Sequence, residues 1–298
     1  MSPALTTARD GTLVVRKHPL PAGTDPLAIW AASTAEHRSY FSQDGFSIAA
    51  LGAAAMIGVD SAGAGITPLT EARLALIDRL DRVDDVMSLL VGGAAFGTVD
   101  RSRGPQWRRF PASRFVLPEL LVLRRGDRCW AVTVGNVADA CLAEVASAPP
   151  VDPAPLHGLP AIDTEADLDY QDLVAGAVEA IRSGAGPDES RTGQLQKVVL
   201  ARCLHVTDPE PYAGTTAELA GVLARLRNRY PDCATFGLAA GDETFFGATP
   251  ERLVSRYRGI VRSAAVAGSI ARGADPVADR ALGRQLLASA KDHAEHRY

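Results

Sequence analysis

Residues 115–134 read FVLPELLVLRRGDRCWAVTV and carry the clearest structural signal in the chain. Two runs, Phe115–Leu123 and Cys129–Val134, are rich in residues that favour strands. The turn sequence Arg125-Gly126-Asp127 lies between them. The pattern predicts a β-hairpin, and with it a sheet-rich first part of the chain.

The sequence before the hairpin adds a helix and excludes two nucleotide-binding motifs. Thr70–Leu80 has the pattern of a helix that is capped by Thr70 and carries Glu71 in its first turn. Gly92-Gly93 suggests close backbone packing, because neither G-x-G-x-x-G nor G-x-x-x-x-G-K-[ST] occurs anywhere. Dinucleotide and P-loop binding are therefore unsupported.

A proline-rich segment divides the chain into two parts. Residues 147–167 contain five prolines and are typical of a linker between a sheet-rich part, 1–146, and a second part, 168–298. The second part alternates helices with short strands. The predicted helices are Tyr170–Arg182, Thr215–Arg229 and Asp275–Tyr298, and the predicted strands are Lys197–Ala201, Phe236–Ala239 and Thr244–Phe246. The fold class is α/β or α+β.

The last predicted helix has a clear start and no clear end. Asp275 is a plausible N-cap and Pro276 occupies the first helical position. The helical pattern still continues at Tyr298, without a C-terminal glycine or a polar exit. Such an ending is typical of a fragment, so we expect the 298 residues alone to be poorly stable and to lack turnover.

Composition restricts the class of protein. With 298 residues and 47% hydrophobic content, the chain can form a sizeable core. Its net charge of −4, without a basic tract, disfavours nucleic-acid binding. Its longest apolar stretch, Ile48–Val59, is shorter than the ~20 residues that cross a bilayer. Four cysteines outside any C-x-x-C pattern indicate reduced thiols, so we expect a cytoplasmic protein without membrane or nucleic-acid partners.

Two residues are candidates for acid–base chemistry. Lys197 begins an apolar run, where a lysine is either a solvated edge residue or, if buried, a general base. Glu251 follows Pro250 in Gly247–Leu253, where it is either a turn carboxylate or a partly buried general acid.

Two further motifs could bind a ligand. Gly268 in Ala267-Gly268-Ser269 either makes an ordinary turn or offers its backbone amide to a carboxylate. Glu295 belongs either to a solvated helix face or to a Mg²⁺ site, since its oxygen ligands suit that ion. The spacing of Asp292, His293, Glu295 and His296 matches no zinc-protease motif.

Taken together and in order, these motifs resemble the chorismate-utilising enzymes, and specifically the siderophore-type isochorismate synthases. The similarity covers Phe96–Tyr298. Its strong motifs are Lys197–Arg202, Phe246–Leu253, Ala267–Ser269 and Leu286–Asp292 leading into Glu295-His296; weaker echoes are Trp107, Phe110-Pro111 and Phe115–Pro118.

The resemblance implies the family's fold, in which large β-sheets are flanked by outer helices, here incomplete at the C-terminus. Residues 168–298 would be the first portion of the catalytic region. Lys197 stands where the isochorismate- and salicylate-forming enzymes keep a water-activating lysine. Ala267 stands where aminodeoxychorismate synthases place a nucleophilic lysine. The resemblance therefore implies attack by water and not by nitrogen.

The implied reaction is the Mg²⁺-dependent conversion of chorismate to isochorismate. Lys197 would deprotonate the water that attacks C2, and Glu251 would protonate the departing C4 hydroxyl. Gly268 and Ser269 would contact the substrate, with the Gly268 amide on a carboxylate, and Glu295 would bind Mg²⁺.

Departures from the family keep two alternatives open. Many relatives carry glutamate at the position of Ala264, and the family's second Mg²⁺-binding glutamate lies beyond the position of Tyr298. The Ala-Gly-Ser variant resembles the catechol-siderophore enzymes, although menaquinone and salicylate pathways stay open. The alternatives are a salicylate synthase and a non-catalytic truncated remnant. A monomer is expected by resemblance.

Overall fold

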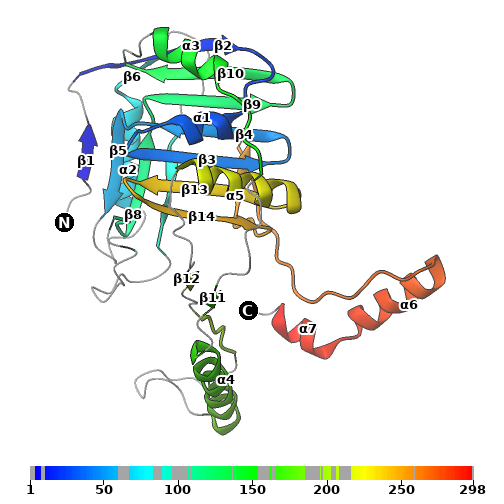
Figure 1. Ribbon diagram of the computed structural model, residues 1–298. Coiled ribbons are helices and arrows are strands. Elements are labelled where there is room, and N and C mark those ends of the chain that lie inside the picture. The colour runs from blue at the N-terminus through cyan, green and yellow to red at the C-terminus, as the bar shows by residue number, and fades with distance from the viewer. Residues whose placement is uncertain are drawn as a thin grey trace.

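The computed structural model describes most of the chain (Figure 1). The described residues are 4–7, 11–59, 67–82, 89–95, 107, 109–135, 137, 139–153, 161–162, 165–184, 195, 197–202, 206–207, 216–257 and 259–296.

The main element is an eight-stranded sheet in the order β14-β13-β3-β4-β9-β10-β2-β6. All neighbours are antiparallel except β2 and β6. Its strands are β2 (Leu13–Leu20), β3 (His37–Gln43), β4 (Phe46–Leu51), β6 (Leu80–Arg82), β9 (Leu120–Arg125), β10 (Arg128–Val134), β13 (Ala234–Ala240) and β14 (Glu243–Thr249). The sheet thus takes strands from both sides of residues 147–167. The predicted boundaries at residues 147–167 remain a prediction, but the large sheet contains strands from both sides of them.

A second sheet has four strands in the order β1-β5-β8-β7. They are β1 (Ala4–Thr7), β5 (Ala55–Val59), β7 (Val91–Ala94) and β8 (Ser113–Leu117). The chain passes from β8 to β9 of the larger sheet at Pro118, which has no N–H to donate to a sheet neighbour. The predicted single strand Phe115–Leu123 is therefore wrong: it is two strands in two sheets.

The predicted hairpin itself is confirmed as β9–β10. Gly126 occupies its turn with a φ of +59°, a backbone conformation that favours glycine. The hairpin β13–β14 is likewise confirmed, and Gly241 with a φ of +65° lies in its turn.

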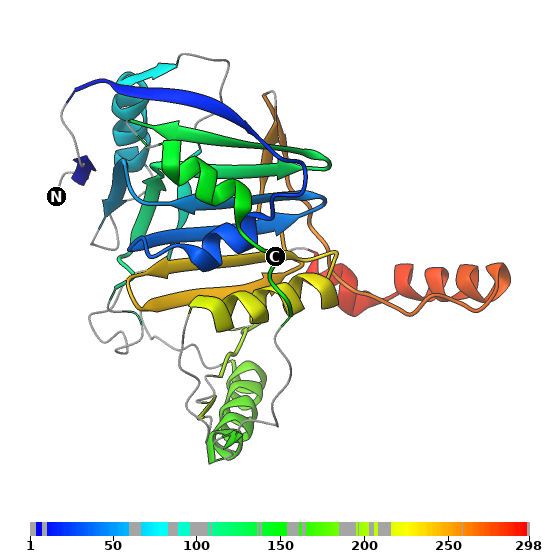
Figure 2. The same cartoon turned by 45° about the horizontal axis from the view of Figure 1, so that its top comes forward.

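Helices cover one face of the large sheet. They are α1 (Pro26–Ala32), α3 (Asp139–Ser147) and α5 (Thr216–Arg229), whereas α2 (Thr67–Ile77) packs with the core between the two sheets (Figures 1 and 2). Side chains along β4 and β9 alternate between the two cores: Ile48 and Leu121 face the inter-sheet core, while Ala49 and Val122 face the helices. Burial on both faces explains why these strands read as continuous apolar runs.

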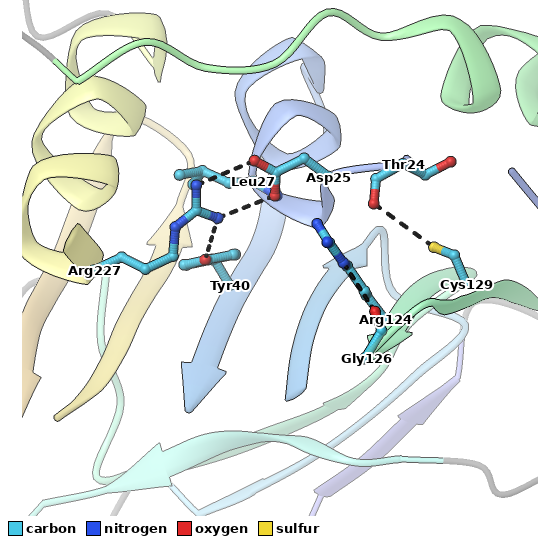
Figure 3. Close-up of polar contacts among 8 residues, drawn as sticks. All are labelled: Thr24, Asp25, Leu27, Tyr40, Arg124, Gly126, Cys129 and Arg227. Atoms are coloured by element: carbon cyan, nitrogen blue, oxygen red, sulfur yellow. Dashed lines mark hydrogen bonds and ion pairs between the residues drawn. The ribbon is translucent and has the colours of Figure 1, made fainter. Parts of the chain in front are cut away.

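A polar cluster holds α5 to the sheet and to α1 (Figure 3). The Arg227 guanidinium donates to both carboxylate oxygens of Asp25, at 3.1 and 3.2 Å, and to the Tyr40 hydroxyl at 3.2 Å. Asp25 also accepts from the Leu27 N–H and so caps α1. Nearby, the buried Cys129 thiol donates to the Thr24 carbonyl at 3.8 Å, and burial raises its pKa. Cys129 and Cys233 are free thiols.

The remaining elements lie outside this two-sheet body. They are α4 (Glu165–Ser183), the ribbon of β11 (Ala161–Ile162) and β12 (Val206–Thr207), the ribbon of β15 (Ser255–Tyr257) and β16 (Ile260–Arg262), α6 (Pro276–Leu287) and α7 (Ala290–Glu295). Figures 1 and 2 show α4 and α6 projecting away from the sheets. We refer to the described residues from Pro250 to His296 as the C-terminal arm.

Three predicted boundaries need correction. Helix α2 begins at Thr67, so Thr70 lies inside it and does not cap it. Helix α4 begins at Glu165, within the predicted linker. The predicted Asp275–Tyr298 helix begins as expected, because the Asp275 carboxylate accepts from two backbone N–H groups. It breaks at Ala288, and Ser289 caps a separate helix, α7.

Candidate functional site

Helix α7 presents two carboxylates on one face. Asp292 and Glu295 are three residues apart, a spacing that places side chains side by side on a helix. Ser289 fixes the start of α7 by accepting from the Asp292 N–H at 3.3 Å. The face is therefore acidic and locally well defined.

Lys197 lies against this face. Its Nζ donates to Oε1 of Glu295 at 2.9 Å, and both side chains are about 40% exposed, at 41% and 38%. The hydrogen bond and the charge of Lys197 lower the pKa of Glu295. The ion pair joins two of the predicted site residues, which are 98 residues apart in sequence.

Gly268 touches the same face. Its φ of +80° lies in the left-handed region that favours glycine. A Cβ added to Gly268 would lie 2.6 Å from Cγ of Asp292, so only glycine allows the backbone to come this close to α7. Three of the four predicted motifs thus meet at the "α7 cluster", which consists of Lys197, Gly268, Asp292 and Glu295. The neighbouring Ser269 is exposed.

Glu251 is not part of the cluster in the described structure. Its side chain is exposed, its N–H donates to Oγ1 of Thr249 at 3.1 Å, and its carboxylate has no hydrogen bond or ion pair with any described residue. Arg252 tethers the segment to the β3–β4 turn through Asp44, at 3.3 Å. The joint action of Lys197 and Glu251 on one substrate stays a prediction.

The predicted buried strand Lys197–Ala201 is wrong for this structure. Residues 197–202 form no strand, and Val199 is 85% exposed. A strand is stable only beside neighbours that satisfy its backbone and cover its side chains. No such neighbour pairs with these residues in the described part of the chain. Lys197 therefore lacks the burial that would favour a neutral lysine.

The carboxylate oxygens of the α7 cluster are the type of ligand that Mg²⁺ prefers, but the cluster contains few of them. Mg²⁺ prefers oxygen ligands and is commonly held by one or two carboxylates together with waters and substrate. Glu295 and Asp292 offer such oxygens, although the described residues contain no group of three or more potential metal-ligating side chains. Asp292 was not predicted as a site residue; its spacing from Glu295 was the only signal for it.

The described residues include no helix that is long and apolar enough to cross a membrane.

Comparison with known proteins matches this chain to one family. The sequence profile described as "Chorismate binding enzyme" matches residues 3–298. The salicylate biosynthesis isochorismate synthase of Pseudomonas aeruginosa is 32% identical over 229 residues, which is 70% of this chain and 43% of that protein. The isochorismate synthase DhbC of Bacillus subtilis is 42% identical over 109 residues, covering 35% of this chain and 27% of that protein.

The fold agrees with this assignment. The solved structure of MenF, the menaquinone-specific isochorismate synthase from Escherichia coli, matches with a TM-score of 0.62 and 22% identity, over 99% of this chain and 62% of that one. The mixed α+β fold with a large sheet is thus the predicted fold of the family. The chain spans less than half the length of the curated relatives that it matches. On the strength of the profile match over nearly its whole length, the chain belongs to the chorismate binding enzyme family.

Proposed function

We propose that this chain carries part of a cytoplasmic isochorismate synthase, an isomerase that converts chorismate to isochorismate. The observation that carries the proposal is the meeting of Lys197, Gly268 and Glu295 at α7, although their motifs are far apart in sequence. The names of the relatives support the same reaction.

In this reaction a hydroxyl moves by addition of one water and loss of another. Lys197 takes a proton from the water that attacks C2, and the ring double bonds shift. Glu251, in its protonated form, gives a proton to the C4 hydroxyl, which leaves as water. Lys197 can act as a base only after its ion pair with Glu295 opens, because a lysine that donates to a carboxylate is holding its proton.

The backbone at Gly268 would bind the substrate. Its amide, with Ser269 beside it, would hold a substrate carboxylate, since a backbone N–H in a left-handed turn is a ready anion donor. Glu295 would hold Mg²⁺, and Asp292 is a second carboxylate within reach of the same space. When bound, the metal ion would neutralise charge on the substrate and anchor its ring carboxylate.

A chorismate assay tests the proposal. Residues 1–298, and any longer product of the same gene, are incubated with chorismate and Mg²⁺, and isochorismate is measured by chromatography. Isochorismate from the longer product, with none from residues 1–298, is the expected result. Release of pyruvate would indicate a salicylate synthase, and a longer product without any turnover would indicate a non-catalytic protein.

Variants of the active form test the residue roles. Lys197→Ala and Lys197→Arg should both abolish turnover, because arginine cannot be deprotonated. Glu251→Gln should lower the rate by ~10²-fold or more, as expected for a positioned acid. Lys17→Ala, on β2 of the sheet body, is the matched control and should leave the rate unchanged. Normal turnover by Lys197→Ala would refute the base assignment.

The proposal also covers the pathway that the product enters and the oligomeric state of the protein. The Ala267-Gly268-Ser269 variant favours a product that feeds catechol siderophore synthesis, and the protein is expected to be a monomer. Quantifying 2,3-dihydroxybenzoate in cells with and without the gene would test the pathway.

A further inference from the structure

An open cavity of about 430 Å³ lies in the sheet body and shares no residue with the α7 cluster. Its walls come from β3 and the β13–β14 hairpin of the large sheet, from β7 and β8 of the small sheet, and from the segment before β8. It contains no residue of the α7 cluster and none of the predicted catalytic residues. Its volume falls in the range that holds small molecules.

One wall of the cavity is aromatic. The Trp107 ring lies 5.4 Å from Phe245 and 6.0 Å from Phe110, measured between ring centroids. Arg109 holds this segment in place: its Nε pairs with Asp242 at 2.9 Å, and its N–H donates to Glu243 at 3.2 Å. The rings thus lie against β14 and can stack on a planar ligand.

Arg114 brings a positive charge to the same cavity. Its guanidinium lies 5.8 Å from the centre of the Phe110 ring and makes no hydrogen bond or ion pair within the described chain. Burial lowers its pKa, and the charge of Glu36 partly offsets that effect. The guanidinium is partly exposed in the pocket, so its donors are available to an anionic ligand there.

His37 lies beside Arg114 in the lining of the same cavity. Its Nδ1 is buried and has no hydrogen-bond partner among the described residues. Burial, followed by the charge of Arg114, lowers the pKa of His37, so the imidazole is neutral at pH 7. Because Nδ1 is shielded from the cavity, the ring of His37 forms part of the wall beside Arg114 and brings no charge to it.

We propose that this cavity binds a small aromatic monocarboxylate. The carboxylate would accept from Arg114, and the ring would stack against Trp107, Phe110 and Phe245. One planar guanidinium can bind one carboxylate through a bidentate pair of hydrogen bonds. A dianion such as phosphate fits less well, because the walls supply a single cation and are otherwise largely apolar.

The test uses 4-fluorobenzoate as the probe and the 298-residue chain as the protein. Binding is followed by broadening of the ¹⁹F signal and by quenching of tryptophan fluorescence. We expect 4-fluorobenzoate to bind and its neutral isostere 4-fluorobenzamide to bind at least about tenfold more weakly. Inorganic phosphate should not compete.

Variants assign the binding to this cavity. Arg114→Gln should weaken binding by about tenfold or more, while Arg125→Gln, at the exposed end of β9, should not change it. Val91→Phe should also block binding, by filling the cavity from β7 without altering Arg114. This second variant keeps the test decisive if Arg114→Gln fails to fold, which circular dichroism will reveal.

Three outcomes would overturn the proposal. The first is a folded wild-type chain that leaves the ¹⁹F signal unchanged. The second is equal binding by the wild type and a folded Arg114→Gln. The third is loss of binding in Lys197→Ala together with retention in Arg114→Gln, since that result would place the carboxylate at the α7 cluster. The test is independent of the proposed enzyme activity.

Discussion

The sheet body and the C-terminal arm are built from similar residues but differ in burial. In the body, Trp30, Tyr40 and Leu223 are fully buried between helices and sheet. In the arm, neither α6 nor α7 contains a buried residue, and Leu253 is 85% exposed. Apolar side chains stabilise a fold only where other atoms replace the water around them. The body is therefore the stable part of this chain.

This difference bears directly on the candidate site. Most of the predicted site residues lie in the arm, whose contacts are hydrogen bonds and ion pairs at the surface. Segments with few buried contacts open at low free-energy cost. The stability of the body and the geometry of the α7 cluster are thus separate quantities, and each can be changed without the other.

The largest expected effect comes from a pair of leucine truncations. Leu223→Ala removes a fully buried side chain that packs against Gly237 and should lower the free energy of unfolding by about 2–5 kcal/mol. Leu253→Ala, in the arm, should change it by no more than about 0.5 kcal/mol. Urea unfolding followed by tryptophan fluorescence measures both. Equal effects would show that the arm folds together with the body.

A second pair compares two arginines. Arg227→Met removes three hydrogen bonds and leaves the Asp25 carboxylate without its cation, at a cost of about 1–3 kcal/mol. Arg252→Met breaks an exposed pair with Asp44 and should cost about 0–1 kcal/mol. Thermal unfolding of the two variants side by side gives the comparison. A larger loss for Arg252→Met would mean that the arm contributes to body stability.

A third pair sharpens the role of Gly268. Alanine at a positive φ costs about 1–2 kcal/mol, and this cost applies equally to Gly268→Ala and Gly259→Ala. Only the Cβ at position 268 would meet Asp292, because the space around Gly259 is open. Hydrogen exchange in α7 should accelerate in Gly268→Ala and stay unchanged in Gly259→Ala. Equal exchange would exclude close packing of Gly268 on α7.

The smallest effect is a difference in acid sensitivity. Burial holds the pKa of His37 below its ordinary value of 6.5, so the unfolded state binds a proton more readily. Stability of the body should therefore fall as the pH drops below about 6.5, until the folded-state pKa is passed. His37→Gln should flatten that part of the profile. Unfolding midpoints between pH 7.5 and 5 would detect it.

The arm should respond to acid in a lower range. The hydrogen bond from Lys197 lowers the pKa of Glu295, and backbone N–H groups lower that of Asp275. The stability that these two carboxylates contribute to the arm is fully present above their ordinary pKa values of 4.5 and 3.8. It is lost as the pH falls through their lower pKa values in the folded state. Exchange rates in α6 and α7 should thus stay constant from pH 7 to 5, after correction for intrinsic chemistry.

Elements that local chemistry determines were predicted correctly from the sequence. The β9–β10 turn follows from Gly126, and the start of α6 follows from Asp275 and Pro276. Segments whose structure depends on which other elements pack against them were predicted wrongly. Lys197–Ala201 has the composition of a buried strand but lacks a sheet to join, and nothing local predicted the change of sheet at Pro118. The cavity with His37 and Arg114 was not predicted, because its walls come from both sheets, although Trp107 and Phe110 in its lining belong to the weaker family motifs.

The sequence by itself determined the family, the mixed α+β class and the residue types available for chemistry. These depend on motif order, side-chain periodicity and turn residues, which are properties of neighbouring positions. Only the tertiary structure decided that Lys197 pairs with Glu295, that Gly268 abuts Asp292 and that Glu251 lies apart. Such contacts join residues tens of positions apart, and packing of whole elements sets them. A sequence pattern can nominate these residues, but only the fold brings them together.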